Sequence, residues 1–243
     1  TQNTGVSMNI RFGSVFSAPL KVNTGTASFY NSDYPNPAIF NGTITVDAGA
    51  TFTVLGGGYF VRANNSVTNN GIIDGSSSTF IMKGSSLINN DTIRTTYFEL
   101  DTSTSLTGTG VYKSAFISVG SSGNITLASN INFSPANVLT VNSGGVINAN
   151  TKVFLFNSGT FRLNFGATVS NSGTFQTQNS VSLIIKNGSN FNIPLRIFSG
   201  TATTYDDGLP YNAVFKGTIT VETGAVLHVS DGGFYTQANN NVT

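Results

Sequence analysis

The chain has 243 residues, of which 39% are hydrophobic and only 9% are charged, and its formal net charge is +1. This hydrophobic content predicts a folded chain, whereas a near-neutral charge without clusters of lysine and arginine argues against nucleic acid or an anionic membrane as a partner. Cysteine is absent, which excludes disulfides and thiolate metal sites, and no apolar run approaches the roughly 20 residues that cross a bilayer.

Short runs of alternating hydrophobic and polar residues follow one another along the chain. Positions 44, 46, 52 and 54 are apolar between threonines, and the same period of two returns in residues 161–165, 181–185 and 191–197. This period predicts strands that bury one set of side chains and expose the other. No stretch combines a helical period with helix caps, so we expect no helix.

Turns rich in Asn, Gly and Ser separate these runs. Examples are Asn69–Gly71 and Asn89–Asp91, and the phrase NSGTF begins at Asn157 and again at Asn171. Asn and Gly tolerate positive φ, and turns that recur about every 14 to 20 residues are typical of the coils of a β-helix. Stacked coils would align Asn side chains into ladders and Phe rings into stacks. The sequence therefore predicts an all-β, right-handed parallel β-helix (β-solenoid) with Asn/Gly/Ser corners, and a β-sandwich array is the alternative.

The end of the chain repeats its beginning. The stretch GTITVDAGATFTV at 42–54 returns as GTITVETGAVLHV at 217–229, and PLKV at Pro19 returns as PLRI at Pro194, always 175 positions later. We therefore predict that residues 1–175 form one full solenoid repeat. Residues 176–243 then begin the next repeat as a second copy of residues 1–68, continuous with the first.

The runs GTITVDAGATFTV, VTNNGIIDG and NSGTFRLNFGATVSNSGTF resemble the β-solenoid passages of large secreted bacterial surface adhesins. These are the filamentous-haemagglutinin and autotransporter-like adhesins and their relatives among very long repetitive surface or filament proteins. The resemblance implies a rod-like, non-enzymatic protein that is secreted to the cell surface.

The chain offers few catalytic candidates. His228 is the only histidine, and neither it nor the doublet Asp206 and Asp207 is shared by the two copies of the repeat. Glu99 and Asp101 would share one face of a strand, as a pair of glycosidase carboxylates requires, but a solvated outer face is the plainer interpretation. The spacing of a calcium-binding nonapeptide does not occur. We expect no enzymatic activity, no metal and no cofactor.

Two equivalent segments interrupt the alternating pattern with proline, aromatic and acidic residues, at 30–37 and 205–212. Loops on a rigid scaffold are frequent binding sites, and tyrosine suits contact with sugars or proteins, although each segment can also be a long loop without a ligand. The candidate binding residues are Tyr30, Asp33, Tyr34, Tyr205, Asp206, Asp207 and Tyr211.

Together these features lead us to expect a structural and adhesive segment of a long extracellular surface protein or filament, a stiff rod that displays loops for cell-surface or matrix contact. A strand spacing of about 4.8 Å and about 20 residues per coil make one repeat roughly nine coils and 40 Å long. The expected partners are other copies of the repeat stacked end to end, with cell-surface glycans or matrix proteins as ligands. Low charge favours bundling and biofilm-like contact. The alternatives are a polysaccharide-active β-helix enzyme or a carbohydrate-binding module, whereas ice binding would need Thr-x-Thr on every coil.

Overall fold

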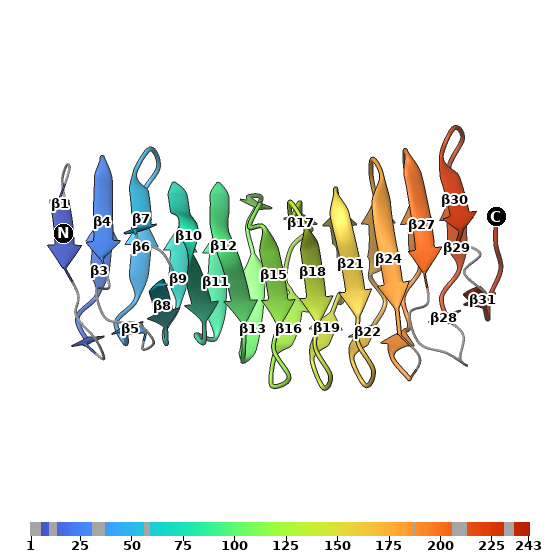
Figure 1. Cartoon of the computed structure of the whole chain (residues 1–243), viewed down its shortest axis with the longest axis horizontal. Coiled ribbons are helices and arrows are strands. Elements are labelled where there is room, and N and C mark those ends of the chain that lie inside the picture. Colours follow the sequence, from blue (N-terminus) through green and yellow to red (C-terminus); the bar gives the residue numbers. More distant parts are fainter. Residues whose placement is uncertain are drawn as a thin grey trace.

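The computed structural model describes residues 6–9, 14–30, 37–55, 59–186, 188–205, 213–230 and 236–243. These residues form β-strands and no helix, and every pairing between the strands is parallel. Figure 1 shows the strands side by side along one elongated body, from the N-terminus at one end to the C-terminus at the other. The protein is therefore a parallel β-solenoid, and the β-sandwich alternative is wrong. The described residues contain no helix long and apolar enough to cross a membrane.

Each coil supplies one strand to each of three parallel stacks, which we call face 1, face 2 and face 3. Face 1 contains β1 (Val6–Asn9), β4 (Thr26–Tyr30), β7 (Thr51–Leu55), the first parts of β10 (Ile72–Met82) and β12 (Thr92–Leu100), β14 (Val111–Tyr112), β17 (Ile131–Phe133), β20 (Val153–Phe156), β23 (Thr174–Thr177), β26 (Leu195–Ile197) and β29 (Ile219–Val221).

Face 2 follows face 1 in every coil, and face 3 completes the coil. Face 2 contains β2 (Val15–Phe16), β5 (Ala38–Phe40), β8 (Tyr59–Ala63), the second parts of β10 and β12, β15 (Phe116–Val119), β18 (Val138–Val141), β21 (Gly159–Leu163), β24 (Val181–Ile185), β27 (Thr201–Tyr205) and β30 (Val226–Val229). Face 3 contains β3 (Leu20–Val22), β6 (Ile44–Val46), β9 (Val67–Asn69), β11 (Ser86–Asn89), β13 (Ser103–Thr107), β16 (Asn124–Leu127), β19 (Val146–Asn148), β22 (Thr168–Ser170), β25 (Asn190–Phe191), β28 (Ala213–Phe215) and β31 (Thr236–Ala238).

The core is a continuous column of inward side chains along the axis of the rod. Alternation works as the sequence predicts: in β24, for example, Val181, Leu183 and Ile185 are buried, while the residues between them are half-buried. Many of the largest buried side chains are phenylalanines from successive coils, and their rings contact one another, as in the pair Phe80 and Phe98 with centroids 6.0 Å apart. Apolar burial of this kind is the main favourable term in folding.

Asparagine ladders join the coils at the corners, as expected. The Nδ2 of Asn69 donates to the Oδ1 of Asn89 at 2.8 Å in a buried pair, and the Nδ2 of Asn90 donates to the Oδ1 of Asn70 at 2.7 Å in an exposed pair. A further Asn pair, from Asn171 to an earlier coil, has a distance of 2.8 Å. Asn171 also has a φ of 84°, a left-handed conformation that asparagine tolerates.

The two copies of the repeated sequence form the same local structure. The strands β4, β5 and β6 of the first copy correspond to β27, β28 and β29 of the second, 175 positions later. An ion pair of 3.1 Å joins Lys21 to Asp47 in the first copy, and one of 2.7 Å joins Arg196 to Glu222 at the equivalent positions of the second. The sequence thus reproduces strands, corners and cross-coil contacts in both places.

The second copy nevertheless lies one face further around the rod than the first. On face 1, eight successive register steps lead from Ala27 to Ile197, which is about 21 residues per coil. The residues between them in this ladder are Phe52, Ile73, Ile93, Tyr112, Phe133, Phe156 and Thr177. The copy of Ala27 is Ala202, which lies on face 2 and pairs with Val181. One repeat therefore spans eight coils plus one face, instead of the roughly nine coils expected.

Candidate functional site

The loops predicted to bind a ligand fall largely outside the described residues. Tyr30 ends β4 and Tyr205 ends β27, and the structure describes their backbone. The other predicted residues, Asp33, Tyr34, Asp206, Asp207 and Tyr211, lie outside the described residues. Because β4 belongs to face 1 and β27 to face 2, the two predicted loops connect different pairs of faces.

The candidate catalytic residues do not form one cluster. His228 is exposed on β30 and lies beside Thr203 of the preceding coil, far along the chain from Glu99. Glu99 and Asp101 both lie on the outer side of the rod, and the Oδ2 of Asp101 contacts the Nζ of Lys83 at 2.7 Å. Among the described residues, no group of three or more His, Asp or Glu side chains lies close enough to hold a metal ion.

The environment of Glu99 changes its acidity. Partial burial raises the pKa of the Glu99 carboxyl, the nearby charge of Asp101 raises it further, and the ammonium of Lys83 lowers it in part. Raised carboxyl pKa values are frequent at functional sites, although structural ion-pair networks also produce them. Glu99 is therefore a candidate functional residue.

Glu99 lines a hollow of about 400 Å³ on the outer side of face 2. It is lined by Phe60, Ser77, Ser78, Thr79, Tyr97, Glu99 and Ser118. The strands β8, β10, β12 and β15 contribute these residues, so four consecutive coils build the hollow. None of the residues is close in sequence to the predicted loops.

An irregularity in β10 opens the hollow. Gly75 pairs with Thr95 and Thr79 pairs with Tyr97, so β10 has three residues between its paired positions where β12 has one. Extra residues of this kind form a β-bulge, which disrupts the ladder locally and redirects side chains. The bulge lies where face 1 continues into face 2, directly before the strand segments that carry the hollow.

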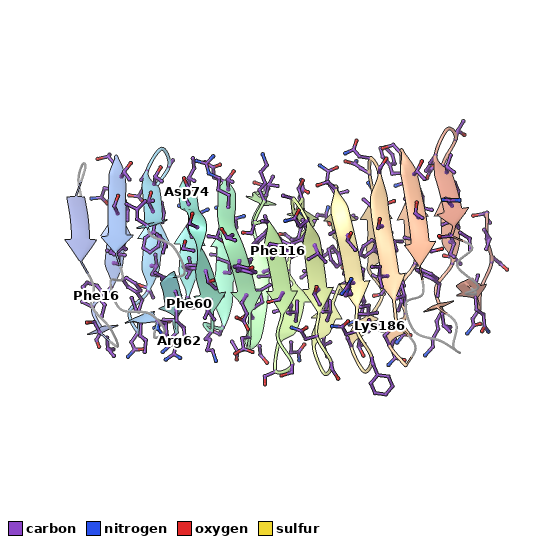
Figure 2. The ribbon with its side chains drawn as sticks, viewed as in Figure 1. Phe16, Phe60, Arg62, Asp74, Phe116 and Lys186 are labelled. Atoms are coloured by element: carbon purple, nitrogen blue, oxygen red, sulfur yellow. The ribbon has the colours of Figure 1, made fainter. Side chains whose placement is uncertain are left out.

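Outward side chains of successive coils form a column across the hollow. The register aligns Phe60, Thr79, Tyr97 and Phe116 in that order. Thr79 is only 8% exposed and forms the floor, whereas Tyr97 is 50% exposed. Phe60 and Tyr97 stand on either side of Thr79, and Phe116 lies behind Tyr97; Figure 2 labels Phe60 and Phe116. The hollow thus has aromatic residues on both sides of Thr79 along the axis of the rod.

Tyr97 is held firmly in this position. Its ring stacks on Phe116 with centroids 4.9 Å apart and an interplanar angle of 16°. The hydroxyl of Thr95 donates to the backbone carbonyl of Tyr97 at 2.8 Å, and the backbone N–H of Thr95 donates to the hydroxyl of Ser114 at 3.0 Å. Ser78 is also buried, and its hydroxyl donates to the carbonyl of Val54 at 3.2 Å. A polar network in the core therefore supports the bulge and the ring.

Two other hollows have a different character. One, of about 380 Å³ on face 1, includes Asp74, Arg94 and Lys113, and an ion pair of 3.0 Å joins Arg94 to Asp74 (labelled in Figure 2). The other, of about 520 Å³, lies at a corner beside Phe165, an aromatic residue that is 64% exposed, and Lys186. Neither combines two aromatic residues with a half-buried carboxylate.

Sequence reasoning did not find this site. The one available signal is the short run 97–100, in which the apolar Phe98 and Leu100 place Tyr97 outward. The alternation shifts phase just before it, because counting by twos from the buried Ile93 would place Tyr97 inward. No family model matches the chain, and neither a curated protein nor a solved structure matches it.

Proposed function

We propose that this chain is a structural and adhesive segment of a long extracellular surface protein or filament. The observation that carries the proposal is the unbroken parallel stacking of coils around a single apolar core. Bending such a rod would stretch the ladders on one side and compress those on the other, so stiffness follows from the fold. The resemblance to bacterial surface adhesins and the nearly uncharged surface support an extracellular place for it.

The rotation between repeats adds a geometric argument for adhesion. Eight coils and one face correspond to about 40 Å at the usual strand spacing of about 4.8 Å. In a tandem array, each repeat would present its equivalent surfaces one face further around the axis. Three repeats would then display the same surface on all three sides, within roughly 120 Å. Such a rod meets cell-surface glycans, matrix proteins or neighbouring rods from any direction.

Scattering and binding measurements test the two parts of this proposal. Small-angle X-ray scattering of the chain should give the length distribution of an elongated particle, and beads coated with the chain should be retained on surfaces that carry glycans or matrix proteins. A compact particle would overturn the rod. Retention no greater than that of beads coated with an unrelated soluble protein would overturn adhesion.

A polysaccharide-active enzyme remains the second candidate because Glu99 and Asp101 lie on the same outer side. Asp101 is engaged by Lys83, however, and a glycosidase pair needs one carboxyl group to donate a proton and the other to act as a base or nucleophile. We therefore favour binding without turnover. Release of reducing ends from a polysaccharide, lost in Glu99→Gln and in Asp101→Asn, would reverse this preference.

A further inference from the structure

We propose that the hollow on face 2 is a glycan-binding site, in which Phe60 and Tyr97 clamp one pyranose ring of a neutral glycan. The proposal names the ligand chemistry of the adhesive rod and so rests on that function. It rests on residues that the sequence pattern alone did not single out.

The spacing along the rod suits a sugar ring. Phe60 and Tyr97 are two strands apart in the register, with Thr79 between them. Two strand spacings amount to about 9.6 Å. A ring held between two aromatic surfaces needs about 7 to 8 Å, twice the contact distance between carbon atoms, and the pucker of a pyranose fills part of the remainder. The short side chain of Thr79 leaves this space open.

The orientation of Tyr97 is also suitable. Its centroid lies 4.9 Å from that of Phe116, close to one strand spacing, and the two rings are nearly parallel. The rings therefore stack along the axis of the rod. Phe116 covers one surface of Tyr97, so the opposite surface of the Tyr97 ring is on the side of the hollow, which Phe60 also lines.

The chemistry of the hollow matches both the apolar faces and the polar rim of a pyranose ring. The C–H groups of a sugar ring pack against the electron-rich faces of aromatic rings, while its hydroxyl groups point outward from the rim of the ring. Glu99, Ser77 and Ser118 line the hollow and supply hydrogen-bond acceptors and donors for these hydroxyls. A few polar groups beside apolar walls are typical of sites for small ligands.

The charge of the hollow selects among ligands that stack on aromatic rings. A nucleotide would bring its phosphate near the carboxylate of Glu99, and like charges repel. Of the nearby cations, Lys83 contacts the neighbouring Asp101 at 2.7 Å, and Arg62 of β8 is not among the residues that line the hollow. A neutral sugar avoids this repulsion and uses the carboxylate as an acceptor.

The site is preorganised, which lowers the cost of binding. The stack with Phe116 and the hydrogen bond from Thr95 hold Tyr97 before a ligand arrives. The buried hydroxyl of Ser78 ties the bulge to the preceding coil. Groups that are already fixed lose little conformational entropy when a ligand binds.

The test uses the intact chain and three soluble probes: hexasaccharides of β-1,4-linked glucose, α-1,4-linked glucose and β-1,4-linked N-acetylglucosamine. Titration followed by ligand-observed NMR should show binding of at least one probe at a Kd of about 1 mM or tighter, the range accessible to one clamped ring. Signals of the bound C–H protons should shift upfield, because they lie over aromatic rings. Failure of all three probes to bind at 10 mM would overturn the proposal.

Substitutions then locate the binding. Tyr97→Ala and Phe60→Ala should each weaken the affinity about tenfold or more, whereas Tyr97→Phe should stay within threefold of the native chain. Phe165→Ala is the matched control, since Phe165 is 64% exposed and lies outside this hollow. Affinity unchanged in both alanine variants, or lost equally in the control, would overturn the proposal. If Tyr97→Ala does not fold, Phe60→Ala and the NMR shifts of the native chain decide.

The result of this binding test can be distinguished from the result of the scattering test of the proposed function. A chain that scatters as a rod but binds none of the probes loses the glycan site and keeps the rod. A chain that binds through Phe60 and Tyr97 but scatters as a compact particle keeps the site and loses the rod. Circular dichroism and thermal unfolding of each variant show that any loss of binding does not come from unfolding.

Discussion

Replacing Tyr112 with phenylalanine should stabilise the protein. Tyr112 is fully buried in the core, where its ring packs between Phe98 and Phe133 at centroid distances of 5.7 and 4.9 Å. Its hydroxyl has no hydrogen-bond partner among the described residues. The phenol oxygen therefore loses its hydration on folding and gains nothing in return.

The size of the effect follows from two opposing terms. A buried hydroxyl without a partner costs about 1 to 3 kcal/mol, which Tyr112→Phe would recover. The substitution leaves a void of one oxygen atom, which costs a few tenths of a kcal/mol at about 24 cal/mol per Å³. The aromatic packing stays the same. We expect a net gain of about 1 kcal/mol, or a rise in Tm of about 2 to 4 °C for a chain of this length.

The gain should also depend on pH. Burial raises the pKa of the Tyr112 phenol well above the ordinary value for tyrosine, about 10. Above that ordinary value the unfolded tyrosine ionises while the buried one stays neutral, so the native chain loses stability as the pH rises further. Phenylalanine has no such loss. The advantage of Tyr112→Phe should therefore be constant near neutral pH and grow above about pH 10.

Urea unfolding followed by circular dichroism at several pH values provides the assay. The control is Tyr97→Phe, because Tyr97 is half exposed and its hydroxyl can reach water. This control should change the free energy of unfolding by less than about 0.5 kcal/mol. A loss of about 1 kcal/mol or more in Tyr112→Phe would refute the reasoning and would indicate that a buried water satisfies the hydroxyl.

Three further predictions concern the ladders, the carboxylate and the rotation of the repeat. Asn89→Ala should destabilise the chain by about 2 kcal/mol because it removes one of the two acceptors of the buried Asn69 amide, whose Nδ2 keeps only the carbonyl of Thr92. Asn90→Ala in the exposed ladder should cost less than about 1 kcal/mol, and equal losses in urea unfolding would contradict this. Burial and the charge of Asp101 raise the pKa of Glu99, so the ionisation of Glu99 lowers the folding stability as the pH rises through that pKa. Glu99→Gln should therefore raise Tm at pH 7 but not at pH 3, and a lower Tm at pH 7 would count against this explanation. Ser182→Cys with Thr203→Cys should form a disulfide under mild oxidation, because these positions are register partners on face 2 and the chain has no other cysteine; a failure to form it would argue against the rotated register.

Much of the fold could be predicted from local features of the sequence. Alternation with a period of two specifies which side chains of each strand point inward, and Asn and Gly specify where the chain turns. The buried Val181, Leu183 and Ile185 and the ladder from Asn69 to Asn89 are examples of each. Alternation depends only on neighbours in sequence, and a ladder needs only the same residue type in the next coil. Both features can therefore be recognised without knowing the register.

The candidate site could not be predicted in the same way. The short run 97–100 identifies Tyr97 as an outward residue but does not tell which side chains lie beside it. Its neighbours Phe60, Thr79 and Phe116 are separated from it by 37, 18 and 19 positions, unequal steps that are set by the bulge in β10 and by the lengths of the corners. Because the number of residues per coil varies, the sequence alone does not determine which residues of successive coils lie side by side.

The repeat shows the same division between sequence and tertiary structure. The sequence by itself determined that Gly42 and Gly217 are equivalent positions of the two copies, and the structure shows the same packing at both, where a Cβ would overlap a backbone carbonyl of the preceding coil. It also determined which residues of the two copies face inward, because alternation is a local property. Only the tertiary structure decided that the second copy lies on the next face. The 175 residues of the repeat are not a whole number of coils, and each face of the solenoid accepts the same pattern of inward apolar and outward polar residues. Because the strand pattern fits all three faces, the face on which a strand lies depends on the summed length of the coils before it. That length is fixed only when the chain folds.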